Sequence, residues 1–133
     1  MGSELLRVGA FVAACCATGC ASRVAVTGTA DKALVSFKGG HGQKVPVTTI
    51  SVFELRDGLR GRVVCELGTR TMSSVSDLNS WIYGTSLPGY EMKCEPLARE
   101  RKYGIQVEPI DHNAFSTHFI VRADGSVIDV GRE

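Results

Sequence analysis

Cysteine and histidine are the residue types in this sequence that can hold a metal ion or form a covalent link, so their spacing is the first guide to its chemistry. Three of the five cysteines, Cys15, Cys16 and Cys20, fall within six positions. Adjacent cysteines are not a ligand spacing, and no histidine or second cysteine cluster stands nearby to complete the four ligands of a zinc site. We therefore expect no metal site in this segment.

The stretch from Asp111 to His118 is the other candidate for metal chemistry, because it also contains His112. Imidazole nitrogens are common ligands of zinc and copper. In a regular strand, however, His118 has the opposite parity to Phe115 and Phe119 and faces solvent, while His112 falls in the preceding turn. We expect neither a metal nor another cofactor. Because no nucleophile with its base can be identified, we expect no enzyme.

Size and charge restrict the class of protein further. A chain of 133 residues with a formal net charge of +1 suits one domain. The basic residues are scattered along the sequence and form no block. This pattern argues against nucleic acid, and against an anionic membrane surface, as the main partner, because both require a concentrated positive footprint.

The N-terminus has the pattern of a secretory signal peptide. Arg7 precedes about ten apolar or small residues, too few for a membrane-spanning helix, which needs about 20. The run ends in Ala-Thr-Gly-Cys at residues 17–20, which resembles the lipobox of bacterial lipoproteins. The resemblance implies cleavage after Gly19 and acylation of the Cys20 sulfur, and several acyl chains anchor a protein stably. Plain secretion and a cytoplasmic helix are the alternatives.

The same resemblance implies a location and a division of the chain. In this family an aspartate after the lipidated cysteine tends to retain the protein at the inner membrane, so Ala21 implies an outer-membrane lipoprotein facing the periplasm. We expect a helical signal peptide at residues 1–19, a lipid-anchored polar tether at residues 20–33 and a folded domain at residues 34–133. The tether would let the domain stand off the membrane.

Two cysteines remain in the folded domain, Cys65 and Cys94. An oxidising compartment permits them to pair. The disulfide would close a loop of about thirty residues and stabilise the fold by roughly 3–4 kcal/mol in the chain-entropy model. Two unpaired, buried thiols are the alternative.

The sequence of the domain that contains these residues predicts β-strands separated by turns. Alternation is clearest in Tyr-Gly-Ile-Gln-Val-Glu-Pro at residues 103–109 and in Phe-Ser-Thr-His-Phe-Ile-Val at residues 115–121, and period two indicates half-buried strands. Asp-Gly pairs at residues 57–58 and 124–125 predict tight turns. Further strands are expected at residues 34–37, 45–55, 63–67, 80–83 and 90–95, with a last one after residue 125. No helical stripe follows the signal peptide, so an antiparallel sandwich or barrel is expected.

One spacing sharpens the choice of fold. Leu97 stands six residues before Tyr103, and this resembles the corner before the penultimate strand of fibronectin type III and other immunoglobulin-like domains. The resemblance implies that the Tyr103 hydroxyl bonds to the upstream backbone and pins the crossover between two sheets. Arg99 and Glu100 stand where the family often has proline and glycine. We expect an all-β, immunoglobulin-like Greek-key sandwich, with a transthyretin-like sandwich or a small barrel as the alternative.

These features together predict a non-catalytic envelope lipoprotein that serves as a protein-interaction or accessory module. The alternative is an inhibitor or small-ligand binder that uses the glycine-rich loop at residues 38–44 or a pocket between the sheets. A contiguous apolar patch on the surface would favour the first function. A deep pocket with convergent polar groups would favour the second.

Overall fold

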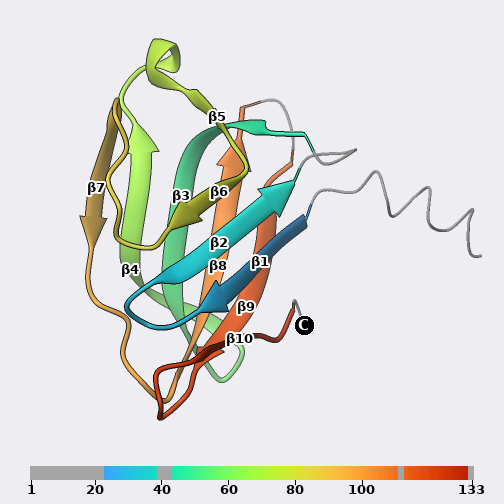
Figure 1. Cartoon of the computed structure of the whole chain (residues 1–133), viewed down its shortest axis with the longest axis vertical. Coiled ribbons are helices and arrows are strands. Elements are labelled where there is room, and N and C mark those ends of the chain that lie inside the picture. Colours follow the sequence, from blue (N-terminus) through green and yellow to red (C-terminus); the bar gives the residue numbers. More distant parts are fainter. Residues whose placement is uncertain (1–22, 39–42, 111–112, 132–133) are drawn as a thin grey trace, which may run out of the picture.

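The computed structural model describes residues 23–38, 43–110 and 113–131 (Figure 1). They form two antiparallel sheets that face each other as a sandwich, so the predicted all-β class is confirmed. The predicted signal peptide and Cys20 lie outside the described residues. The strands are β1 Arg23–Gly28, β2 Ala33–Lys38, β3 Val45–Arg56, β4 Leu59–Thr69, β5 Ser76–Leu78, β6 Ser80–Ile82, β7 Tyr90–Cys94, β8 Arg101–Pro109, β9 Phe115–Val121 and β10 Val127–Asp129, and one short 3-10 turn, η2, covers Met72–Ser74.

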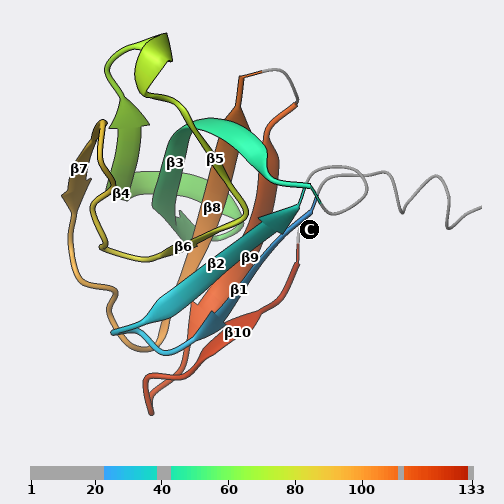
Figure 2. The same cartoon turned by 45° about the horizontal axis from the view of Figure 1, so that its top comes forward.

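The two sheets differ in size. The small sheet has the order β1-β2-β6, and the large sheet has the order β10-β9-β8-β3-β4-β7. The first residues of β3 pair with β5 and the later ones with β4. Because β5 and β6 are separated only by Asn79, the chain passes directly from the large sheet to the small one at this point (Figure 2).

The core lies between the sheets and follows the alternation expected from the sequence. Tyr103, Ile105 and Val107 of β8 are buried, and so are the alternate residues of β9 that begin with Phe115. The rings of Tyr103 and Phe119 stack with their centroids 5.5 Å apart. Both predicted half-buried strands are therefore confirmed.

The predicted tether at residues 20–33 is wrong from Arg23 onward. Residues 23–28 form β1, which pairs with β2 along its whole length, from Arg23 opposite Lys38 to Gly28 opposite Ala33. Val26 is only 1% exposed. The segment is short and rich in small residues, but it alternates, and alternation places the Val26 side chain in the core once β2 is available as a partner. The folded domain thus begins at or before Arg23.

Backbone conformation explains a tight turn in the large sheet, and the absence of a side chain explains a close contact there. Asp57 and Gly58 both have positive φ, at 55° and 77°, as the tight turn predicted between β3 and β4 requires. Both strands run further than the sequence pattern indicates. Gly104 of β8 is needed for a different reason, because a Cβ atom there would lie 2.4 Å from the ring of Phe53 on β3.

Candidate functional site

The predicted corner before β8 is present. The Tyr103 hydroxyl accepts a hydrogen bond from the Ala98 backbone N–H at 2.8 Å, and Leu97 is buried. Glu100 occupies the left-handed region with a φ of 59°, which is the conformation a glycine would adopt without strain. Its N–H donates to the Val121 carbonyl at 2.6 Å, and this bond ties the turn to β9. Because β7 and β8 both belong to the large sheet, the corner positions a connection within that sheet and not the expected crossover between two sheets. It carries no reactive group.

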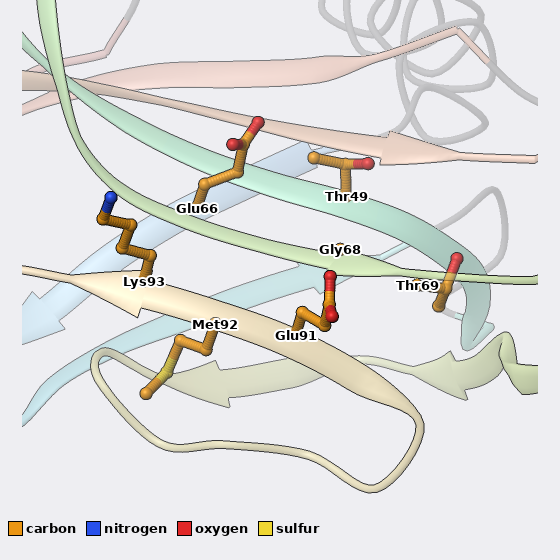
Figure 3. A pocket seen from close by; sticks show the side chains of 7 residues that line it. All are labelled: Thr49, Glu66, Gly68, Thr69, Glu91, Met92 and Lys93. Atoms are coloured by element: carbon orange, nitrogen blue, oxygen red, sulfur yellow. The ribbon is translucent and has the colours of Figure 1, made fainter.

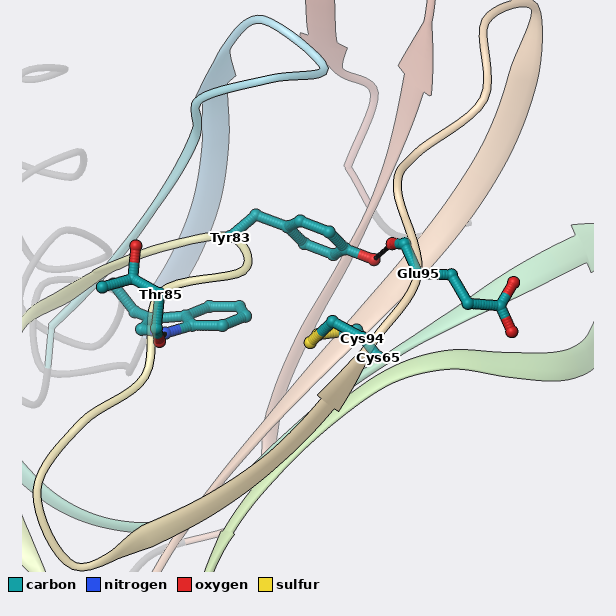
Figure 4. The surroundings of a disulfide bond; sticks show 6 residues. Cys65, Tyr83, Thr85, Cys94 and Glu95 are labelled. Carbon is teal, nitrogen blue, oxygen red and sulfur yellow. Dashed lines mark hydrogen bonds between the residues drawn. A yellow bond between two sulfur atoms is a disulfide. The ribbon is translucent and has the colours of Figure 1, made fainter.

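Cys65 and Cys94 form the predicted disulfide (Figure 4). They stand directly opposite each other on β4 and β7. The ring of Tyr83 reaches past them, and its hydroxyl donates to the Glu95 carbonyl at 2.5 Å. Burial is the main cause that raises the pKa of Tyr83 above its ordinary value. The disulfide is therefore part of a packed edge between the sheets.

The core also contains Trp81, which is 3% exposed. Its indole N–H donates to the Thr85 carbonyl at 2.7 Å, and its ring lies 5.7 Å from that of Tyr83. Because the N–H is satisfied within the chain, the buried ring leaves no polar handle for a ligand.

A carboxylate that sequence reasoning missed is buried at the far end of β3. Glu54 is 7% exposed, and its oxygens lie 3.3 Å from Arg62 and 3.5 Å from both Arg56 and Arg101. Arg62 also bonds Glu95 at 2.5 Å, which lowers the pKa of Glu95 and raises that of Arg62. A buried charge needs partners of opposite sign. Because each charge in this cluster has a partner of opposite sign, we interpret the cluster as a set of ion pairs that stabilises the fold.

Sequence reasoning also missed a second carboxylate, Asp129, which joins the two sheets at the edge where β1 faces β10. It accepts hydrogen bonds from the Val26 N–H at 2.8 Å, the Thr117 hydroxyl at 2.9 Å and the Gly131 N–H at 2.8 Å. Val26 belongs to the small sheet and Thr117 to the large one. Asp129 therefore closes an edge that would otherwise present an unpaired backbone donor.

The candidate metal ligands do not come together. Asp111 and His112 lie outside the described residues. His118 is on the outer face of β9, half-buried, and its Nδ1 has no hydrogen-bond partner. Within residues 23–38, 43–110 and 113–131, no group of three or more histidine, cysteine, aspartate or glutamate side chains is placed to hold an ion.

A shallow pocket of about 210 Å³ lies over β4 and β7 (Figure 3). Glu91 and Lys93 contribute to its rim, and Glu91 is held by Arg70. Ligand sites usually enclose roughly 300–1,000 Å³. The pocket lies on the outer side of β3, β4 and β7 and is too small and open to be the deep inter-sheet site of a ligand binder. Its full lining is Thr49, Glu66, Gly68, Thr69, Glu91, Met92 and Lys93.

The outer surface of the small sheet differs from that of the large one. Its outward positions include the charged pair of Arg23 and Lys38 at one end. The remaining outward positions carry no charge and form what we call the uncharged face: Ala25, Thr27, Leu34, Ser36, Ser80 and Ile82. Leu34 and Ile82 are directly opposite each other and are 37% and 45% exposed. On the large sheet, by contrast, the exposed cross-strand neighbours Glu66 and Lys93 are charged.

No family model, curated protein or solved structure matches this chain. In the described part of the chain, no helix is long and apolar enough to cross a membrane.

Proposed function

We propose that this chain is a non-catalytic envelope lipoprotein, acylated at Cys20 and facing the periplasm from the outer membrane, whose sandwich binds another protein. Two sets of residues support the anchor and its location: the lipobox-like Ala-Thr-Gly-Cys at residues 17–20, and Ala21 after it. The direct test is Cys20→Ser, which should move the protein from the membrane to the soluble fraction. Unchanged membrane association would contradict the anchor.

The domain is proposed to be immunoglobulin-like. In such domains one sheet has the strand order A-B-E and the other contains C-F-G, with a tyrosine corner at the start of strand F. The order β1-β2-β6 corresponds to the first, and β3-β8-β9 corresponds to the second. The bond from the Ala98 N–H to the Tyr103 hydroxyl stands at the start of β8, where the corner belongs.

The uncharged face is the observation that carries the interaction role. The cores of protein interfaces are depleted in charged residues. An exposed face of an antiparallel sheet ordinarily bears polar and charged side chains. Here Leu34 and Ile82 form an apolar pair, and small uncharged residues surround it. A protein partner with an apolar, uncharged surface fits this face better than a small ligand fits the shallow pocket over β4 and β7.

Site-specific photo-crosslinking in intact envelopes tests this role. A photoreactive residue at position 34 or 82 should give a discrete adduct with a partner protein. The matched controls are positions 66 and 93 on the charged outer surface of the large sheet, which should give none. Adducts of equal yield from both surfaces, or none from positions 34 and 82, would contradict the proposal.

A charged substitution on the uncharged face tests the same interaction without a photoreactive residue. Ile82→Lys should abolish capture of the partner, because it buries an unpaired charge in the interface. Glu66→Lys, which changes charge on the other sheet, should leave capture intact. Thermal unfolding of both variants would show that the loss does not come from misfolding.

A further inference from the structure

We infer that one end of the sandwich rests on the membrane surface and binds lipid headgroup phosphates through Arg23, Lys38 and Lys44. This inference depends on the proposed acylation of Cys20. The end consists of the start of β1, the end of β2 and the start of β3, which lie together in Figure 1. A phospholipid bilayer is thus the partner of this end, in addition to the protein partner of the uncharged face.

The distance along the chain from the anchor sets this geometry. Only Ala21 and Ser22 separate Cys20 from Arg23, the first residue of β1. Three residue steps span at most about 11 Å when fully extended. Acyl chains on Cys20 hold that residue at the membrane surface, so Arg23 lies within about one headgroup layer of it. The domain has no room to stand off, as a tether of fourteen residues would have allowed.

The charges at this end are arranged for an anionic surface. Arg23 and Lys38 are directly opposite each other on β1 and β2, and both are exposed. Like charges at directly opposed positions destabilise a sheet. Among the described residues, neither has a carboxylate within ion-pairing distance. An anion between them removes the repulsion, and lipid phosphates supply such anions at the height where Arg23 lies.

Two further residues extend the same surface. Lys44 is exposed directly before β3. The acids on the strands beside the start of β3 include Asp77, opposite Pro46 on β5, and Glu108, opposite Thr49 on β8. Ile110 follows β8, donates its N–H to the Pro46 carbonyl at 2.9 Å and is 43% exposed. An apolar side chain beside cations suits the boundary between headgroups and acyl chains. Cations that are scattered in the sequence are therefore gathered by the fold.

The test measures how close each end of the domain lies to the lipids. Lipidated protein with a fluorophore on Gln43→Cys, beside Lys44, is reconstituted in vesicles of phosphatidylethanolamine and phosphatidylglycerol that contain nitroxide-labelled headgroups. The matched control carries the fluorophore on Ala123→Cys, which is also exposed and follows β9 at the other end. Quenching at position 43 should exceed quenching at position 123 several-fold.

Two variants test separately whether the short connection to Cys20 and the charges of Arg23 and Lys38 hold this end of the domain at the membrane. A flexible insertion of about twelve residues after Ala21 should reduce the difference between the two positions, because such a linker allows the domain to move away. Arg23→Gln with Lys38→Gln should reduce quenching at position 43 in the anionic vesicles. Circular dichroism would show that both variants are folded.

The outcomes distinguish this inference from the anchor on which it depends. If the protein does not float with the vesicles, the acylation of Cys20 is wrong. If it floats with them but the probes at positions 43 and 123 are quenched equally, the anchor stands and the inference about this end is overturned. If quenching at position 43 survives the charge variants unchanged, phosphate binding by Arg23 and Lys38 is overturned.

Discussion

Different kinds of contact stabilise the two edges of the sandwich. At one edge β1 faces β10, and a single carboxylate, Asp129, bonds donors from both sheets. At the other edge the Cys65–Cys94 disulfide joins β7 to β4 within the large sheet, and the Tyr90 hydroxyl joins β7 to β3. The Tyr83 hydroxyl, just after β6, bonds the Glu95 carbonyl just after β7. The first edge depends on one acceptor that serves several donors. The second combines a covalent bond within the large sheet with separate tyrosine contacts. A single substitution, at Asp129, should therefore remove most of the stabilisation at the first edge. At the second edge, each substitution should remove only part of it.

The largest expected effect is at the disulfide edge. The variant Cys65→Ala with Cys94→Ala should lose roughly 3–4 kcal/mol of unfolding free energy, because the unfolded chain gains the entropy of an open loop. The sequence separation of the two cysteines is 29. Urea unfolding followed by Trp81 fluorescence measures the loss. Wild-type protein with a reducing agent is the control and should show a similar loss; a change below about 1 kcal/mol in both would argue against this account.

The next effect tests the single acceptor at the other edge. Asp129→Ala should cost about 3 kcal/mol, because it leaves buried or half-buried donors of Val26 and Thr117 without a partner. Asp31→Ala changes an exposed aspartate and should stay within about 0.5 kcal/mol of wild type. Equal losses in the two variants would remove the contrast between the edges.

The third effect asks whether the disulfide edge can lose one contact at a time. The Tyr90 hydroxyl donates to the Val47 carbonyl at 2.5 Å and accepts from the Ser76 N–H at 3.0 Å. Tyr90→Phe should therefore cost about 2 kcal/mol. Hydrogen exchange of the Ser76 amide should accelerate, while that of the Val26 amide at the other edge should follow only the change in global stability. Selective acceleration at Val26 instead would contradict this division.

The smallest effect is at Tyr83 and depends on pH. Tyr83→Phe should cost about 1 kcal/mol at neutral pH through the lost bond to Glu95. Because burial raises the pKa of Tyr83 in the folded state, the unfolded chain ionises first, and the stability held by the neutral hydroxyl is lost as pH rises above about 10. The variant should therefore lose less stability than wild type between neutral and strongly alkaline pH. Parallel stability curves would show that Tyr83 does not cause the alkaline loss.

The sequence predicts this fold best where a strand pattern is local. Residues 103–109 and 115–121 alternate strictly, and both are strands of nearly those bounds. Residues 23–28 also alternate, but small residues and a glycine gave them the composition of a tether. Their burial depends on a partner strand that begins after Gly28, so the composition of the segment alone could not identify it as a strand.

The site residues divide in the same way. The Leu97 to Tyr103 spacing and the two cysteines carry recognisable patterns. The structure shows the predicted bond of the Tyr103 hydroxyl to the upstream backbone and the predicted disulfide, but the corner does not lie at a crossover between the sheets. Asp129 carries none, because its partner Val26 stands 103 residues away in the sequence. Glu54 carries none either, because its place beside Arg101 depends on the pairing of β3 with β8. The gathering of Arg23, Lys38 and Lys44 depends on the register of β1 with β2, which also could not be read from composition.

The passage from β5 to β6 has a consequence for how the molecule opens. Residues 76–82 supply hydrogen bonds to β3 in one sheet and to β2 in the other, with one residue between the two strands. Separation of the sheets must therefore break at least one of these pairings. Native-state hydrogen exchange should show the amides of β2, β3 and β6 opening as one cooperative unit with a shared free energy. Force applied to either sheet would likewise reach the other through seven residues.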